Sequence, residues 1–151
     1  MSATRKDALA ALKAHAVPAL RGLGFKGSMP RFHRVRDAQV DLCAVQFSSG
    51  GGCFAVELGY VDGPRENVDA DLRDGLGDDP ARYSVTSTRE RLRLGAASES
   101  GDHWFIYDTD ATMRPGLRGD VDALAGTVAR LLREDGEAWW RSRGNPSDMK
   151  G

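Results

Sequence analysis

Three strand-like segments follow one another with very short links, and this feature constrains the fold of the chain most. The segments cover residues 31–37, 40–47 and 53–60. The first link is short enough for a tight hairpin, and the second, Ser48 to Gly52, contains three glycines that accept positive φ. Links this short leave no room for a crossover, so the strands are predicted to pair antiparallel as a meander.

A helix is predicted on each side of these strands. The first covers residues 4–22, because Thr4 and Asp7 form the pattern of a capping box and apolar residues recur at spacings of three and four. Pro18 lies inside it and is expected to kink or break it. The last helix covers about residues 120–143, and a bend is expected near Gly136.

The remaining segments complete a prediction of the fold class. Two further strands are expected at 83–95 and 103–108, while 61–82 is rich in Asp, Gly and Pro and is expected to be a loop or one short helix. The order predicts a single α+β domain over residues 1–143: an antiparallel sheet of about five strands with the N- and C-terminal helices packed on one face. The tail, 144–151, is expected to be disordered.

The alternation of side chains along the strands assigns residues to the two faces of the sheet. Phe47 is expected to pair opposite Phe54, and Cys43 opposite Leu58. The core face then carries mostly apolar side chains: Cys43, Val45, Phe47, Phe54, Val56, Leu58 and Tyr60. The outer face carries polar side chains, with Leu42 and Ala44 between them: His33, Gln46, Glu57, Arg89, Arg91 and Arg93.

Composition excludes several classes of function. The 151 residues carry a formal net charge of −1, so no overall positive field favours nucleic acid. No apolar run is long enough to span a membrane, and the N-terminus lacks the apolar region of a secretory signal. The chain is therefore expected to be cytoplasmic, with Cys43 and Cys53 as reduced, unpaired core side chains.

No motif of a metal, cofactor or nucleophile site is complete. The three histidines show no spacing typical of metal ligands. The acidic run that starts at Asp69 departs from a calcium loop, because Arg73 occupies a ligand position. Gly50 to Gly52 is followed by a strand and lacks the G-K-[ST] of a phosphate loop. We therefore predict no cofactor, no metal and no catalytic residue.

Several short motifs together carry a resemblance to a known family. They are Leu23-Gly24-Phe25-Lys26, Phe32 with Arg34, Val45-Gln46-Phe47-Ser48, and Val56-Glu57-Leu58-Gly59-Tyr60, with Arg91, Leu92 and Trp104 as single matches. They resemble the bacterial family of domains of unknown function numbered 4304, from residue 1 to about 140. The resemblance implies the helix–sheet–helix order and points to Gln46, Ser48, Glu57 and Arg91. The family's motifs have an Asn at the position of Glu57 and usually a polar residue at the position of Phe47. The change to Glu57 adds a negative charge, which implies an altered ligand if the family has a site there.

Two functions from different classes follow. The leading hypothesis is a non-catalytic binding or regulatory module that uses the open sheet face against another bacterial protein or a small ligand. An immunity-type role is one example, by analogy. Its predicted binding residues are Gln46, Ser48, Glu57, Arg91 and His33. The alternative is a small hydrolase that uses Glu57 with an Arg as an anion clamp, which requires a deep pocket and a carboxylate of raised pKa. The oligomeric state is left open.

Overall fold

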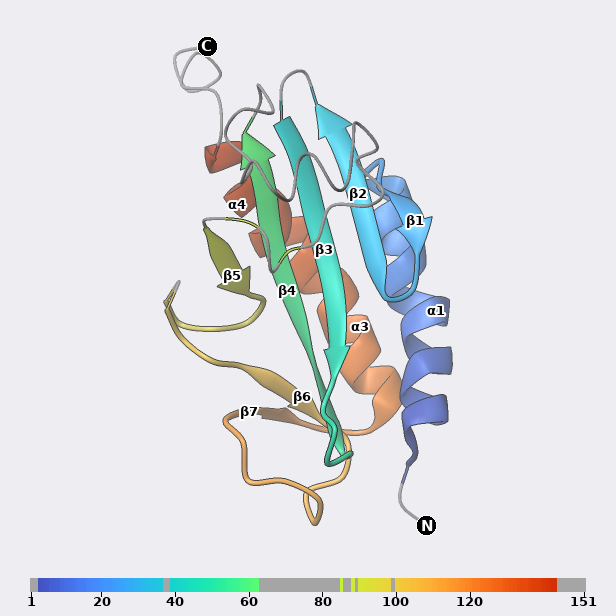
Figure 1. Cartoon of the computed structure of the whole chain (residues 1–151). Helices are drawn as coiled ribbons and strands as arrows, with labels where there is room; N and C mark the ends of the chain where they lie inside the picture. Colours follow the sequence, from blue (N-terminus) through green and yellow to red (C-terminus); the bar gives the residue numbers. More distant parts are fainter. Residues whose placement is uncertain are drawn as a thin grey trace.

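The computed structural model describes residues 3–36, 39–62, 85, 88, 90–98 and 100–143. Two helical segments lie side by side behind a twisted sheet (Figure 1), which confirms the predicted α+β class. The elements in chain order are α1 (Arg5–Gly22), β1 (Lys26–Ser28), β2 (Arg31–Arg36), β3 (Gln39–Phe47), β4 (Cys53–Asp62), β5 (Arg91–Arg93), β6 (Trp104–Ile106), β7 (Gly116–Arg118), α3 (Val121–Leu131), η4 (Leu132–Gly136) and α4 (Glu137–Ser142).

The sheet contains the predicted meander and two short strands that were not expected. Its order is β1-β2-β3-β4-β6-β7, and β5 also pairs with β4. Every pair is antiparallel except β6 with β7. The predicted register is confirmed, because Phe47 lies opposite Phe54 and Cys43 opposite Leu58. The unexpected strands are β1 and β7, each of only three residues.

The hairpin between β3 and β4 forms as the glycines predict. Ser48 donates its N–H to the carbonyl of Cys53 at 3.1 Å and accepts from Gly51 at 2.9 Å. Gly51 and Gly52 have φ of 82° and 81°, a conformation that side chains with a Cβ rarely adopt. A Cβ on Gly52 would also lie 2.9 Å from the carbonyl oxygen of Asp108, so the close approach of this loop to the chain after β6 requires glycine.

The prediction of a long strand over residues 83–95 is wrong in the part that the structure describes. Only Arg91–Arg93 is a strand, and Leu94 and Gly95 already belong to a turn. Before it, the N–H and the hydroxyl of Thr88 both donate to the carbonyl oxygen of Val85, at 3.0 and 2.7 Å. This local turn prevents the backbone from remaining extended. The predictions of a loop or short helix for residues 61–82 and of disorder for residues 144–151 concern residues that lie almost wholly outside the described ranges.

The N-terminal helix has the predicted cap and is not broken at Pro18. Thr4 and Asp7 exchange both hydrogen bonds of a capping box, at 2.9 and 3.2 Å. The helix runs through Pro18 to Gly22 as one element. Proline removes one N–H donor of the ladder. The residues around it are packed, since Ala16, Ala19 and Leu20 are all buried against the core, and this packing holds the turn in place.

The C-terminal helix contains a single π-helical turn where the bend was expected. Asp120 caps α3 by accepting from the N–H of Ala123 at 2.8 Å. The turn η4 ends at Gly136, and α4 continues from it with two tryptophans. Trp140 is fully buried and donates its indole N–H to the carbonyl of Gly59 at 3.0 Å. This bond fixes α4 on the inner face of β4.

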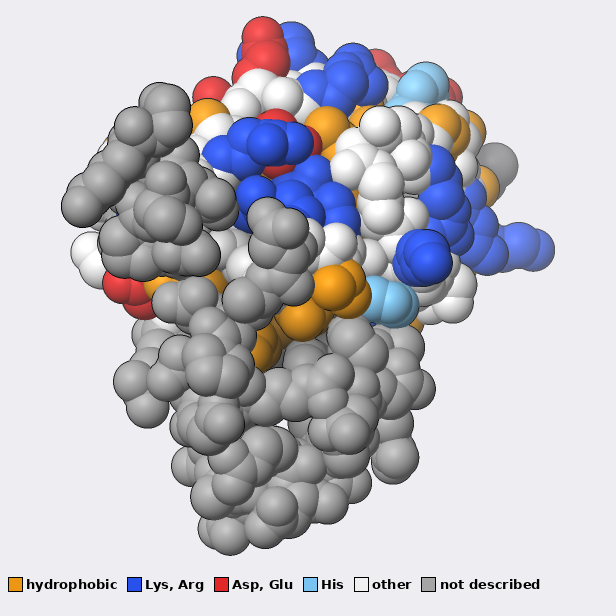
Figure 2. All heavy atoms as spheres, turned by 90° about the horizontal axis from the view of Figure 1, so that it is seen from above, with side chains coloured by type: hydrophobic (Ala, Val, Ile, Leu, Met, Phe, Trp, Pro, Cys, Tyr) orange, Lys and Arg blue, Asp and Glu red, His pale blue; other side chains and the backbone are white. Residues whose placement is uncertain are grey.

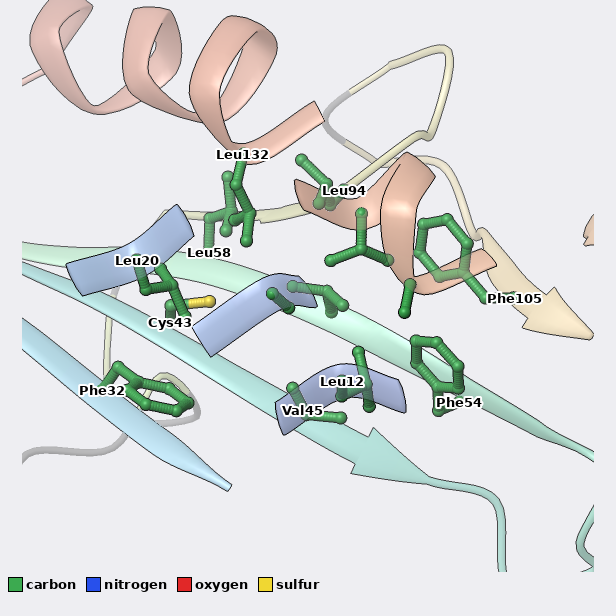
Figure 3. Close-up of a cluster of buried hydrophobic side chains, with 14 of the residues drawn as sticks. Leu12, Leu20, Phe32, Cys43, Val45, Phe54, Leu58, Leu94, Phe105 and Leu132 are labelled. Carbon is green, nitrogen blue, oxygen red and sulfur yellow. The ribbon is translucent and has the colours of Figure 1, made fainter. Parts of the chain in front are cut away.

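The main core lies between the two helical segments and the predicted inner face of the sheet (Figure 3). Strand side chains of the predicted face meet helix side chains there, among them Leu12, Leu20, Cys43, Phe54, Leu58, Leu124 and Leu132. The face assignment of β3 and β4 is therefore confirmed. Cys43 and Cys53 are buried and unpaired, and they lie on opposite faces, since Cys53 packs with Trp104 in a separate cluster. None of the helices described is long and apolar enough to cross a membrane.

Candidate functional site

The predicted site residues lie on the outer face, as the alternation requires, except that Ser48 serves the hairpin. Gln46 lies at the end of β3 opposite Ala55 and is exposed. His33 lies in β2 opposite Leu42, half-buried, and Glu57 lies in β4 opposite Ala44. Ser48 closes the β3–β4 turn through its backbone. With Arg91 in β5, the predicted residues therefore span four strands and a loop.

Glu57 forms an ion pair with Arg93 of β5. The register places Arg93 opposite Glu57 and Arg91 opposite Gly59. Arg93 donates to Glu57 at 3.1 Å, and both side chains are mostly buried, at 17% and 16% exposed. Arg91 is exposed and two residues away along β5. The arginine that binds Glu57 is therefore Arg93, and not the predicted site residue Arg91.

A further set of side chains extends this ion pair across the outer face. Arg93 also donates to Asp102 at 3.0 Å, and Asp102 accepts from the indole N–H of Trp104 at 3.1 Å. The guanidinium groups of Arg93 and Arg114 lie 5.0 and 4.2 Å from the centre of the Trp104 ring, within the range of a cation–π contact. The charges in the middle of this face are thus paired and held in fixed positions.

The outer face is covered over part of its area, so it is less open than predicted. Leu42, expected to lie among polar residues, is only 1% exposed and packs with Val40, Val61 and Val85. A Cβ on Gly59 would lie 2.7 Å from the hydroxyl of Thr88, so Thr88 packs closely against β4 at this point. The uncovered part lies toward the other end of β3, around Ala44 and Gln46.

The uncovered part of the outer face carries an excess of positive charge. Arg31 is exposed opposite Ala44, Arg114 is exposed beside Trp104, and Arg91 is exposed on β5 opposite Gly59, at the edge of the covered part. None of the three forms an ion pair with another residue in the described ranges. The two carboxylates nearby, Glu57 and Asp102, are already bound to Arg93. Figure 2 shows a different region, the upper end of the molecule in Figure 1, where the described surface also carries more Lys and Arg than Asp and Glu. The outer face of the sheet is therefore locally cationic, although the net charge of the chain is −1.

The inner face contains a buried polar network that the sequence interpretation missed. Asp41 is 0% exposed and accepts from Arg34 at 2.9 Å, from Arg36 at 2.6 Å and from Gln39. Arg34, 6% exposed, also binds Glu137 of α4 with two hydrogen bonds of 2.7 Å. The network joins the β2–β3 hairpin to the C-terminal helix.

The ionisation of this network follows from its pairing. Burial opposes the charge of Glu137, but the hydrogen bonds and charge of Arg34 outweigh it and lower the pKa of Glu137. Burial likewise opposes the charge of Arg34, and Glu137 and Asp41 together raise its pKa. Both groups therefore stay charged, and their carboxylate and guanidinium groups are engaged with each other. We interpret this network as structural.

The alternation of side chains along β2 and β3 could have predicted this network from the sequence. Arg34 and Arg36 have the same parity in β2 as Phe32, which is a core residue. Asp41 has the same parity in β3 as Cys43. Charged residues in phase with core residues indicate a buried ion pair. The residues Asp102 and Arg114, by contrast, lie in loops and have no such pattern.

The structure adds no sign of metal or thiol chemistry. In the ranges given above, no group of three His, Cys, Asp or Glu side chains is placed to hold a metal ion. Burial raises the pKa of the Cys43 thiol to about 12, so this thiol is not a nucleophile at neutral pH. Burial also lowers the pKa of His103, against the charge of Asp102.

Comparison with known proteins decides the family. Residues 16–142 match the model of a domain of unknown function, DUF4304. The chain belongs to the DUF4304 family. The resemblance stated above is thereby confirmed for most of this DUF4304 domain, from the C-terminal half of α1 to the end of α4. No curated protein and no solved structure matches the chain.

Proposed function

We propose that this DUF4304 domain is a non-catalytic binding module, and that an acidic segment of a partner protein binds to the outer face of its sheet. The observation that carries the proposal is the charge distribution on that face. Arg31 and Arg91 are exposed without a carboxylate partner among the described residues, while Glu57 is neutralised by Arg93. A surface with free cations and paired anions favours a negatively charged partner.

The rigidity of the middle of the face supports the same function. Trp104 is in contact with two guanidinium groups and donates a hydrogen bond to Asp102, which limits its conformations before any partner binds. Binding to such a preorganised surface loses less side-chain entropy. A regulatory or immunity-type protein would use the face in this way, and two buried, unpaired cysteines fit a cytoplasmic setting.

The hydrolase alternative has weaker support from the geometry. A general acid or base at Glu57 needs a carboxylate that is free to exchange a proton with substrate. The carboxylate instead lies 3.1 Å from Arg93, and Arg93 is further bound to Asp102. The same arginine is thus occupied twice and is a poor clamp for a substrate anion.

The test compares two double variants of equal charge change. Arg31→Glu with Arg91→Glu reverses the outer face, and Lys6→Glu with Arg133→Glu reverses exposed positions on the two helices. Proteins captured from a lysate of the source cells by the wild type are named by mass spectrometry, and the affinity of each purified candidate is then measured. We expect the dissociation constant to rise at least about tenfold for the outer-face variant only. Equal affinity of both variants would refute the proposal.

A further inference from the structure

A cavity of about 410 Å³ lies on the other side of the sheet, beneath the N-terminal half of α1. It exists because β2 begins at Arg31, opposite Ala44, so that β3 runs on for three residues without a partner in β2. The turn between β1 and β2 closes one side of the gap, and α1 lies over it. Its volume is within the range of small-molecule sites.

The walls of the cavity are mostly apolar and contain two cations. The lining side chains are those of Arg5, Leu9, Lys13, Ser28, Met29, Pro30, Val45 and Phe47. Arg5, Leu9 and Lys13 are spaced by four residues, so they follow one another along one face of α1. None of the described residues that line the cavity is acidic. It therefore combines an apolar surface with an uncompensated positive charge.

The two cations of the cavity wall have no carboxylate partner in the described part of the chain. Neither Arg5 nor Lys13 forms an ion pair there, and the nearest acid in sequence, Asp7, is bound in the capping box with Thr4. The guanidinium of Arg5 lies 4.7 Å from the centre of the Phe47 ring, which holds it at the cavity wall. The first turn of α1 adds the partial positive charge of a helix N-terminus.

The strand edge adds a polar group next to the apolar walls. Val45 donates its N–H to the carbonyl of Pro30 at 2.9 Å, at the point where pairing with the hairpin stops. Phe47 lies two residues further along β3, so its N–H points toward the same edge. A carboxylate beside Arg5 would thus find a guanidinium fork and a backbone donor close together.

We propose that this cavity binds a small organic acid, with its carboxylate at Arg5 and its apolar body along Leu9, Met29 and Val45. Lys13 adds positive charge at the other end of the lining stripe. A single carboxylate on an aliphatic or aromatic body matches both the charge and the apolar walls. The site is separate from the outer face and does not depend on the function proposed for it.

The test uses octanoate and its neutral analogue octanamide, titrated into the ¹⁵N-labelled full chain and followed by amide chemical shifts. We expect saturable octanoate shifts at the lining residues, with a dissociation constant on the order of 1 mM or below, and weaker binding of octanamide. Arg5→Gln should weaken octanoate binding about tenfold, because it removes a charge-assisted hydrogen bond. Lys6→Gln is the matched control, since Lys6 is exposed on the same turn and does not line the cavity.

Three results would overturn the proposal: no saturation by octanoate, equal binding of octanamide, or equal affinities of the Arg5→Gln and Lys6→Gln variants. Shifts confined to another surface would also overturn it. Arg5 is exposed at the start of α1, so its variant should fold, and the unliganded spectrum verifies this. Lys13→Gln provides a second charge variant on the same wall.

Discussion

Arg34 binds Glu137 through two parallel hydrogen bonds of 2.7 Å, although the two residues are 103 positions apart in the chain. Arg34 simultaneously contacts Asp41, and its guanidinium lies 4.7 Å from the centre of the Phe25 ring. One side chain therefore joins the second strand, the third strand and the last helix. Loss of one partner from this buried pair is therefore expected to cost more stability than loss of an exposed ion pair.

Removing one partner from the buried network should destabilise the domain strongly. Asp41→Asn removes the carboxylate that Arg36 binds and leaves Arg34 with Glu137 as its remaining carboxylate among the described residues, and loss of a buried partner costs about 3–5 kcal/mol. The exposed pair of Arg130 with Glu134 is the control, and Arg130→Gln should cost about 0.5 kcal/mol or less. Urea unfolding of each variant measures the difference. Similar losses for the two variants would contradict the prediction.

Stability should fall on the acid side because of Glu137. Its pKa is lower in the folded protein, so folding favours the ionised form, and the contribution is complete above the unfolded pKa of about 4.3. It is lost as the pH falls through the folded value. The free energy of unfolding of Glu137→Gln should therefore depend less steeply on pH below about 4.5 than that of the wild type. If the free energy of unfolding had the same pH dependence in the variant and the wild type, the prediction for Glu137 would be wrong.

The two outer-face arginines of β5 should differ in their effect on stability. Arg93 contacts Glu57, Asp102 and the Trp104 ring, whereas Arg91 is exposed. Arg93→Ala should lower the free energy of unfolding by about 1–3 kcal/mol, since it removes the partner of the mostly buried Glu57 carboxylate. Arg91→Ala should change it by less than about 0.5 kcal/mol. Melting temperatures of the two variants provide the comparison. A larger decrease for Arg91→Ala than for Arg93→Ala would contradict the prediction.

The two thiols should react only when the domain opens. Cys43 and Cys53 are both buried, and burial raises the pKa of Cys43 to about 12. Alkylation by iodoacetamide near pH 8 should therefore be slow in the native protein and fast in denaturant, because the thiolate is the reactive form. Mass spectrometry of the modified peptides distinguishes the two sites. Rapid native labelling of Cys43 would show that its surroundings are not closed.

The meander could be predicted from sequence because its signals are local. Short links, glycines in the Ser48–Gly52 loop and alternation of apolar residues together specify the pairing of β3 with β4 and its register. β1 and β7 could not be predicted in the same way. Each has three residues, and Gly116 in β7 has a φ of 151°, which propensity does not assign to a strand.

Alternation predicts which residues of the described strands share the outer face, but it does not predict which of them are in contact. Alternation places Arg91 and Arg93 on the same side, and only the register of β5 against β4 decides which of them meets Glu57. That register depends on the turn at Leu94 and Gly95 and on the chain before Arg91, where no periodic pattern exists. Tertiary packing of Val85 on Leu42 has no local signal either.

The π-helical turn at Leu132–Gly136 has a consequence for the phase of the C-terminal helix. Five buried residues follow one another at intervals of four: Leu124, Val128, Leu132, Gly136 and Trp140. In a uniform α-helix each such interval passes a full turn by about 40°, so four intervals would rotate the last residue about 160° away from the first. The wider turn absorbs part of this rotation. Trp140 can therefore reach the carbonyl of Gly59, and Glu137 can reach Arg34. If the same residues formed a uniform α-helix instead of this turn, both of them would be rotated away from the sheet, even though no contact residue had changed.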